Sequence, residues 1–368
     1  MNQSSQPQQV PQPLDHDYGV TPGDLIRFEL NARGFTQADL AARAGTSAKH
    51  LNQVIQDAVP LSAETALRIE RTLGIPAVVL TQADAVNQAN KQRDKLRKGL
   101  IDHRDWYLKF PKPALQKLSI VNAKSSVQNQ IEDLLVYLGV ADPAAYDAVY
   151  GEGVLSFRRS QRWTVDPHVT ALWLRSAELK ADDLEVEPYN KVAFIELLEQ
   201  LPAVTLLPMS EAFPLLQERC AKVGVAVVFN PSLDGTRASA AVRWLGPERP
   251  VIVLTERGKF EDSVWFSFFH EAAHVVLHPR RKSLIELEGP DDSDGAETDA
   301  NNYAKKILLR GRGRELVKLD GREQLVEFAE KVGIHPGLVA CIWAYNRDKT
   351  AWPVAAKLRA KLDISKLP

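Results

Sequence analysis

The chain has 368 residues, enough for two or three domains, and 45% of them are hydrophobic, which allows sizeable cores. Its formal net charge is −1, so any affinity for nucleic acid must come from a local basic surface. No apolar run approaches the length that crosses a bilayer, and we expect no membrane partner. The two cysteines, Cys220 and Cys341, have no metal-binding or redox spacing, so we expect them to be reduced and buried.

Residues 1–19 are rich in Gln, Pro and Ser and lack the apolar core of a signal peptide. This composition predicts a disordered tail and a cytoplasmic protein.

Residues 20–82 carry the pattern of a small, all-helical DNA-binding domain. Thr36 and Asp39 fit a capping box at the start of a helix, and Gly45 ends that helix. A second helix follows, and either of two residues can cap it: Thr46 or Ser47. Its apolar side chains predict one buried face, made of Leu51, Val54 and Ile55. Two helices joined by such a turn are typical of a helix-turn-helix.

The second helix would present polar side chains near its start, where a recognition helix meets base edges. Asn and Gln suit adenine, and Lys suits guanine or phosphate. The candidate DNA-binding residues are Gln37, Ser47, Lys49, His50, Asn52 and Gln53. The alternative is an ordinary helical bundle with a polar face.

These residues resemble the lambda-repressor-like (XRE) class, and within it the HigA-type antitoxin repressors. Besides the helix pair, the resemblance rests on Thr-Pro-Gly-Asp-Leu-Ile at 21–26 and Glu-Thr-Ala-Leu-Arg-Ile-Glu at 64–70. It implies operator DNA as a partner and a homodimer on two half-sites. A cognate toxin is a further candidate partner.

Residues 83–200 predict a helical connector. Its run 91–98 is highly charged, and such runs are mostly solvated faces. Residues 157–163 interleave basic and aromatic side chains. We favour an ordinary packed helix end for this run; the alternatives are contact with a peptide or with DNA phosphates.

Residues 201–368 predict an α+β domain. Four runs rich in β-branched residues predict short strands at 204–207, 225–229, 240–244 and 251–254. A small sheet packed on a helix would leave an edge strand able to dock an extended peptide.

The segment His270-Glu271-Ala272-Ala273-His274 predicts a metal site. Residues i and i+4 of a helix lie on one face, about 6 Å apart at Cβ, so His270 and His274 can bind one ion. In zinc metalloproteases with this spacing, the metal lowers the pKa of bound water to about 7 and the glutamate, here Glu271, takes the proton. Apolar flanks at 264–269 and 275–277 predict a buried helix, in which these polar side chains would be costly without a metal.

Zinc needs a third protein ligand. Residues 297–309 predict a helix, and Glu297 falls on its apolar stripe, while Asp299 points elsewhere and is the runner-up. Asn301 shares the side of Glu297 and could hold a ligand histidine by a hydrogen bond. His278 suits a helix C-terminus better than a ligand position. Tyr303 is a candidate oxyanion partner, but a core position is favoured.

The acidic segment 286–294 is broken by Gly and Pro and is expected to be a solvated connection.

The spacing His270-Glu271-x-x-His274, followed by Glu297-x-x-Ala300-Asn301-x-Tyr303-Ala304, resembles the ImmA/IrrE family of zinc metallo-endopeptidases. The resemblance implies zinc as cofactor, with His270, His274 and Glu297 as ligands and Glu271 as general base. It also implies a repressor-type protein as substrate, in stress response or mobile-element control. One departure is the Arg-Gly-Arg-Gly-Arg run at 310–314, where the family usually has proline; we expect a solvated loop there.

The predicted fold class is therefore multidomain: an all-α lambda-repressor-like helix-turn-helix domain, a helical connector and an α+β zincin-like metallopeptidase domain. The leading hypothesis is a DNA-binding transcriptional regulator fused to a zinc endopeptidase that cleaves a repressor-type protein. The alternative is a HigA-like antitoxin repressor whose peptidase-like domain is a non-catalytic sensor or partner-binding module. Self-cleavage within the connector is a third hypothesis.

Overall fold

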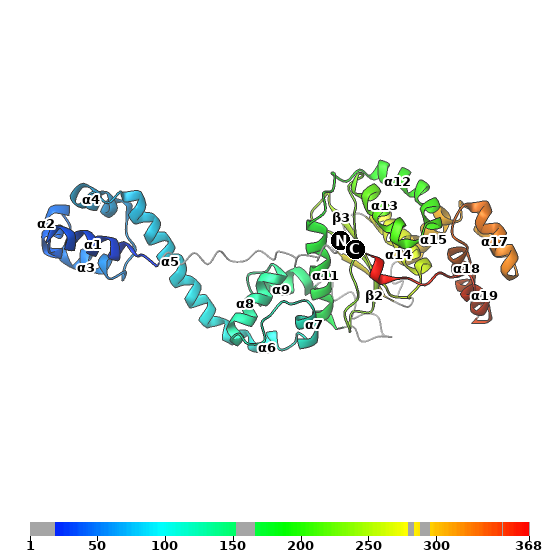
Figure 1. The fold of residues 1–368 in the computed structure, drawn as a ribbon, viewed down its shortest axis with the longest axis horizontal. Coiled ribbons are helices and arrows are strands. Elements are labelled where there is room, and N and C mark those ends of the chain that lie inside the picture. The colour runs from blue at the N-terminus through cyan, green and yellow to red at the C-terminus, as the bar shows by residue number, and fades with distance from the viewer. Residues whose placement is uncertain (1–18, 152–165, 279–282, 288–294, 348, 368) are drawn as a thin grey trace. The chain divides into compact units, whose positions relative to one another are not determined.

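A computed structural model describes residues 19–151, 166–278, 283–287, 295–347 and 349–367 (Figure 1). The predicted tail, the run 157–163 and residues 288–294 lie outside the described residues, apart from Gly19. The chain divides into two compact units. Among the described residues, the N-terminal unit contains 19–107 and 123–132, and the C-terminal unit contains 108–122 and 133–367.

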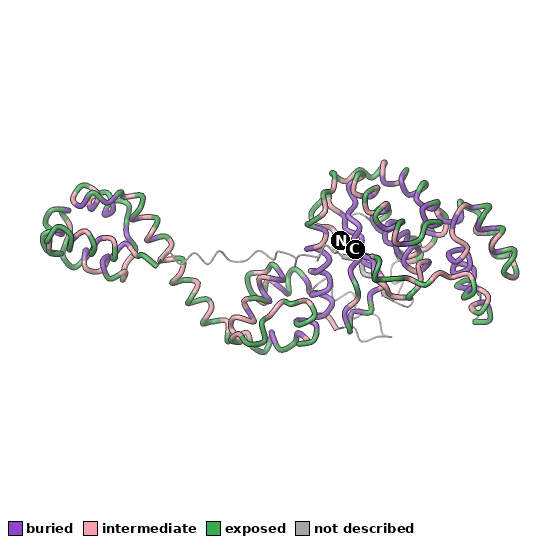
Figure 2. The backbone as a smooth tube through the Cα atoms, in the orientation of Figure 1, coloured by how far each residue is buried: buried purple, intermediate pink, exposed green. Residues whose placement is uncertain are grey.

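The N-terminal unit is helical, and a small aliphatic core holds its first five helices together. These elements are α1 (Pro22–Arg33), α2 (Gln37–Ala44), α3 (Ala48–Ile55), α4 (Ala63–Leu73), α5 (Ala77–Gly99), η1 (Leu100–His103) and α6 (Arg104–Tyr107). Ile26, Leu40, Leu51 and Ile69 are fully buried in this core, which appears in Figure 2 as the purple inner faces of otherwise exposed helices.

Local capping explains where these helices begin and end. The Thr36 hydroxyl accepts a hydrogen bond from the Asp39 N–H at 3.1 Å, and the Asp39 carboxylate accepts one from the Thr36 N–H at 2.9 Å. Gly45 then ends α2 at φ 63°, a left-handed conformation that glycine adopts without strain. Ser47, not Thr46, caps α3. The predicted capping box and helix pair are confirmed.

The C-terminal unit combines many helices with one small sheet. Its helices are α7 (Lys112–Lys117), α8 (Val127–Leu138, which contributes to both units), α9 (Pro143–Tyr146), η2 (Asp147–Gly151), α11 (Pro167–Asp182), α12 (Lys191–Gln200), η4 (Leu201–Leu206), α13 (Met209–Ala221), α14 (Glu261–Leu277), α15 (Ala296–Leu308), α16 (Gly313–Leu316), α17 (Gly321–Val332), α18 (Pro336–Tyr345), η5 (Lys349–Ala351), α19 (Trp352–Ala356) and η6 (Ile364–Lys366). Its strands are β1 (Ala226–Phe229), β2 (Ala238–Trp244), β3 (Pro250–Leu254) and β4 (Ser283–Leu287).

The strands form one mixed sheet in the order β1-β3-β2-β4. β1 runs parallel to β3, with Val227 opposite Ile252, and β2 is antiparallel to both β3 and β4. Three of the predicted strands are therefore present. β4 occupies one edge of the sheet and pairs through Ile285 with Ala241 of β2.

One strand prediction was wrong, and one predicted loop begins inside a strand. Residues 204–207 are not a strand: most of them belong to the 3₁₀ helix η4, where Pro202 lacks an N–H for a ladder and its carbonyl accepts from the Thr205 hydroxyl at 2.6 Å. The segment expected to be a solvated connection begins inside a strand, because Glu286 and Leu287 belong to β4. Their pairing with β2 supplies hydrogen bonds that a local pattern does not reveal.

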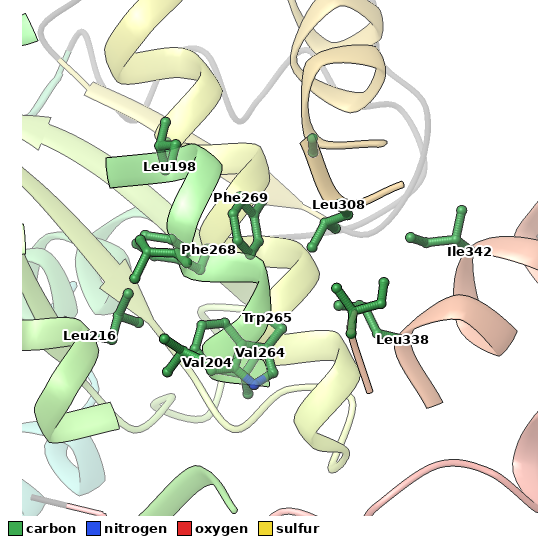
Figure 3. Packing of buried hydrophobic residues seen from close by; sticks show 14 of the residues in the cluster. Leu198, Val204, Leu216, Val264, Trp265, Phe268, Phe269, Leu308, Leu338 and Ile342 are labelled. Carbon is green, nitrogen blue, oxygen red and sulfur yellow. The ribbon is translucent and has the colours of Figure 1, made fainter. Parts of the chain in front are cut away.

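The helix α14 lies at the centre of the hydrophobic core of this unit. Trp265, Phe268 and Phe269 are buried and pack edge-on or tilted against one another, with ring centroids 5.2–6.3 Å apart. Figure 3 shows them among side chains from the surrounding helices, including Leu198, Leu308 and Leu338, which lie far from them in the sequence. The multidomain class is confirmed, with a helical N-terminal domain and an α+β C-terminal domain.

Both cysteines are free and buried, as predicted. Burial raises the pKa of the Cys220 and Cys341 thiols, which keeps them protonated and unreactive. Among the described helices, none combines the length and the apolar character needed to cross a bilayer.

Candidate metal centre and DNA-reading surface

The middle of α14 carries three polar side chains in an apolar setting. His270 and His274 are each 1% exposed, and Glu271 between them is fully buried. The helix packs against β2 and β3 on one side and against α15 and α18 on others, so its whole circumference is covered. This burial follows from the nearly continuous apolar flanks of the motif.

The first turn of α15 brings Glu297 to the two histidines. Gly295 precedes the helix at φ 77°, and Glu297 then extends toward α14. One carboxylate oxygen of Glu297 lies 3.0 Å from His270 Nε2, and the other lies 3.3 Å from His274 Nε2. The two Nε2 atoms are 3.0 Å apart. Three potential ligand atoms from two helices thus converge on one point.

This donor set fits a zinc ion. The ligand atoms all lie within 4.8 Å of one another, and two imidazole nitrogens with one carboxylate oxygen are typical of a zinc site that leaves a position open. Tetrahedral ligands with bonds of about 2.0–2.1 Å are separated by about 3.3 Å, close to the spacings seen here. An ion at the centre of the three groups would accept a lone pair from each of them.

Asn301 lies one turn along α15 from Glu297 and contacts the back of His270. Its Oδ1 is 3.2 Å from His270 Nδ1. When Nδ1–H donates this hydrogen bond, the lone pair on Nε2 faces Glu297 and is available to a metal. Helical spacing alone predicts this position for Asn301.

The electrostatics of Glu297 reflect its histidine neighbours. Burial alone would raise the pKa of this carboxyl, but the hydrogen bonds and charges of His270 and His274 outweigh burial. The pKa of Glu297 therefore lies well below its ordinary value, and the group is a carboxylate at neutral pH.

The other candidates at this end of the chain lie outside the convergent group. Asp299 is exposed. His278 is the C-terminal capping residue of α14, as predicted, and its ring centroid is 5.5 Å from that of His274. Tyr303 is half-buried and packs on the main core. Arg310, Arg312 and Arg314 of the basic run are all exposed, and Arg310 also donates to the Val332 carbonyl at 2.8 Å.

The contacts that hold the start of α14 have no signal in the sequence. Asp262 in its first turn is 3% exposed and accepts two hydrogen bonds from Arg359 Nε, at 2.9 and 3.0 Å. The Arg359 guanidinium also lies over the ring of Phe260, 3.9 Å from its centroid. A backbone hydrogen bond of 3.0 Å joins the Glu261 N–H to the Ala360 carbonyl. The C-terminal segment thus anchors the helix that carries the motif.

The six DNA-binding candidates lie on α2 and α3 or at their starts. Gln37 is the first residue of α2 and is exposed. Ser47 caps α3 by accepting from the His50 N–H at 3.1 Å, and Lys49 is exposed nearby. His50, Asn52 and Gln53 are partly buried. Leu51 of the same helix is fully buried, so α3 has one core face and one polar face.

Comparison with known families matches both ends of the chain. The helix-turn-helix family model matches residues 26–80, and a peptidase-family model described as IrrE N-terminal-like domain matches residues 220–340. The chain joins a helix-turn-helix domain to an IrrE-like domain. The second match includes the sheet, α14 and α15, and therefore every residue of the convergent site. No curated protein matches the chain. The architecture predicted from the sequence is confirmed.

Proposed function

We propose that the chain is a DNA-binding transcriptional regulator whose IrrE-like domain is a zinc-dependent endopeptidase acting on a repressor-type protein. The convergence of the buried His270 and His274 with the partly exposed Glu297, on a helix that also carries the fully buried Glu271, is the observation that carries the proposal. The helix-turn-helix domain supports a target within transcriptional control, because it would bring the peptidase to regulated DNA.

The chemistry divides among five side chains. His270, His274 and Glu297 would hold the zinc ion, with Asn301 fixing the ring of His270. A bound zinc ion supplies Lewis acidity, which activates water and polarises a peptide carbonyl. Glu271 accepts the proton of the attacking water on its carboxylate and delivers it to the leaving amine. Its burial among apolar side chains keeps competing water away and favours proton transfer within the site.

Substrate binding would use the β4 edge of the sheet. β4 pairs with β2 on one side only among the described strands, so its other edge can accept an extended peptide by backbone hydrogen bonds. Such pairing recognises an unfolded or flexible segment of any sequence. Contacts with the side chains of the substrate, or with other parts of the target protein, would therefore select the target.

Metal content and cleavage together test the proposal. We expect purified protein to bind about one zinc ion per chain and to cleave a repressor co-expressed with it. Glu271→Gln should keep the zinc and lose cleavage by at least a hundredfold, the scale of a lost general base. Asp299→Asn is the matched control, because it removes an exposed carboxylate on the helix of Glu297 and should change neither property.

Two results would contradict parts of the proposal. If Glu271→Gln retains both zinc and full cleavage, Glu271 is not the base. If the unmodified chain holds zinc and binds its operator but cuts no repressor, the domain is a sensor or partner-binding module. The proposed cytoplasmic location rests on composition, whereas the homodimer and a cognate toxin rest on family resemblance. Size measurement tests the homodimer, and co-purification tests the toxin.

A further inference from the structure

The helix α5 continues well past the helix-turn-helix domain and carries a row of lysines. It has 23 residues, a length of about 34 Å, yet its only buried residues are Leu80 and Asp84, both in its first half. Figure 1 shows its second half running on beyond the bundle of α1–α4. Residues 91–98 of this half contain five cations and one carboxylate, Asp94.

Three of these cations share one side of the helix. Lys91, Lys95 and Lys98 are spaced i, i+4 and i+7, so they form one stripe, here called the lysine face. The stripe continues the line of Leu80 and Asp84, which point into the helix-turn-helix core. The lysine face is therefore turned to the same side of α5 as the DNA-binding domain.

The lysine face begins where the recognition helix ends. Lys91 Nζ donates a hydrogen bond to the carbonyl of Asp57, two residues beyond the end of α3. Along α3 itself, Lys49, Gln53 and Gln56 lie on one polar stripe at the same i, i+4, i+7 spacing. The first lysine of the lysine face therefore lies at the C-terminal end of α3.

The three lysines have no carboxylate partner in the described part of the chain, in contrast to Arg97, which pairs with Glu132 at 2.7 Å. Arg93 donates a hydrogen bond to a neutral partner, Asn90 Oδ1, at 2.6 Å. The three lysines are exposed, and none forms an ion pair in the described part of the chain. Exposed cations at regular spacing beside a recognition helix suit the phosphates of a duplex.

The geometry points to the lysine face as a second DNA-contact surface, one that binds backbone phosphates flanking the site that α3 reads. This inference rests on the proposed DNA binding and deepens it. Lys91 to Lys98 span about 10 Å along α5, the length of about three phosphate steps of one strand. The contact would add affinity without reading sequence, and it would need duplex beyond the half-site.

Salt dependence of binding tests the inference. The operator would first be found by selecting, from a random DNA pool, the sequences that the full chain binds. The full chain would then be titrated at several salt concentrations with a 40-base-pair duplex that contains this operator. Each phosphate contact contributes about 0.9 to the slope of log K against log salt. Replacing Lys91, Lys95 and Lys98 by Gln should lower the slope by about one to three and weaken binding by up to about tenfold for each phosphate released. A duplex trimmed to the operator should show little difference between variant and unchanged chain.

Matched variants keep the result interpretable. Lys306, Lys318 and Lys357, all exposed in the C-terminal unit, provide a triple Gln variant with the same change in net charge and no expected effect. Lys95→Gln with Lys98→Gln alone leaves the Lys91–Asp57 hydrogen bond in place and should still lower the slope. Replacing all three lysines by Arg should restore it.

The outcomes separate the two claims. If the unchanged chain binds neither duplex, the proposed DNA binding fails and the inference fails with it. If the unchanged chain binds but the lysine variant has the same slope on the long duplex, DNA binding stands and the lysine face is not a phosphate contact. A weakening that Arg does not reverse would also overturn the inference, because charge would not be its cause.

Discussion

The hydrogen bond between Asn301 and His270 gives the sharpest quantitative prediction about the metal centre. Asn301→Ala removes an acceptor, 3.2 Å away, for Nδ1 of a ring that is 1% exposed. Leaving a buried donor without this partner costs about 1–3 kcal/mol. Loss of such an outer contact weakens metal binding by about 10–100-fold, which is about 1.4–2.7 kcal/mol, so the two scales agree. We therefore expect zinc to bind Asn301→Ala about 10–100 times more weakly.

Competition with a chromophoric zinc chelator measures this change directly. Asn301→Asp keeps an acceptor for Nδ1–H and should bind zinc at least as tightly as the unchanged chain. Asn302→Ala is the matched control, since Asn302 is the exposed neighbour on the same helix. Zinc affinity of Asn301→Ala within about twofold of the unchanged chain would refute the reasoning, because the ring would then be held by something other than this hydrogen bond.

Three further predictions concern stability. In metal-free protein, the lowered pKa of Glu297 stabilises the folded state at pH values above the ordinary glutamate pKa. This stability is lost as pH falls below that value, so Glu297→Gln should flatten the dependence of melting temperature on pH between about 3 and 5. Arg359→Ala should destabilise the C-terminal unit by about 3–5 kcal/mol in urea titration, because it leaves the Asp262 carboxylate buried without its cation, and adding Asp262→Asn should recover part of the loss. Gly23→Ala should lower the melting temperature of the N-terminal unit, since its Cβ would lie 2.1 Å from a carbonyl oxygen of α3, whereas Gly99→Ala meets nothing within 4 Å and should be neutral or stabilising.

The parts of the fold that depend on neighbouring residues could be predicted from the sequence. The capping box of Thr36 and Asp39 and the left-handed Gly45 fix α2 within a few residues of chain. The convergence of Glu297 with the two histidines is also accessible, because helical spacing places Glu297 and Asn301 on one side of α15. Helical spacing alone could not decide whether this side of α15 would pack against α14.

The wrong and missing predictions have two causes. Some residues pair with partners that are distant in the sequence, and some form local hydrogen bonds that composition does not reveal. β4 exists because β2 pairs with it, and Glu286 taken by itself looks like part of an acidic loop. Residues 204–207 have the composition of a strand, yet Pro202 and the Thr205 hydroxyl favour a 3₁₀ helix. The anchoring of α14 by Arg359 crosses almost a hundred residues of sequence, and no periodic pattern signals it.

The placement of the ligands on two helices gives the metal centre a mechanical consequence. His274 belongs to α14, which is covered by other elements, while Glu297 belongs to the first turn of α15. About two dozen residues separate the two ligands in the sequence. Ligation would therefore join a rigid support to a helix end and close a loop, as a covalent cross-link does. The first turn of α15 would fray in zinc-poor conditions while α14 keeps its core. Zinc supply would then decide how firmly this helix end is folded.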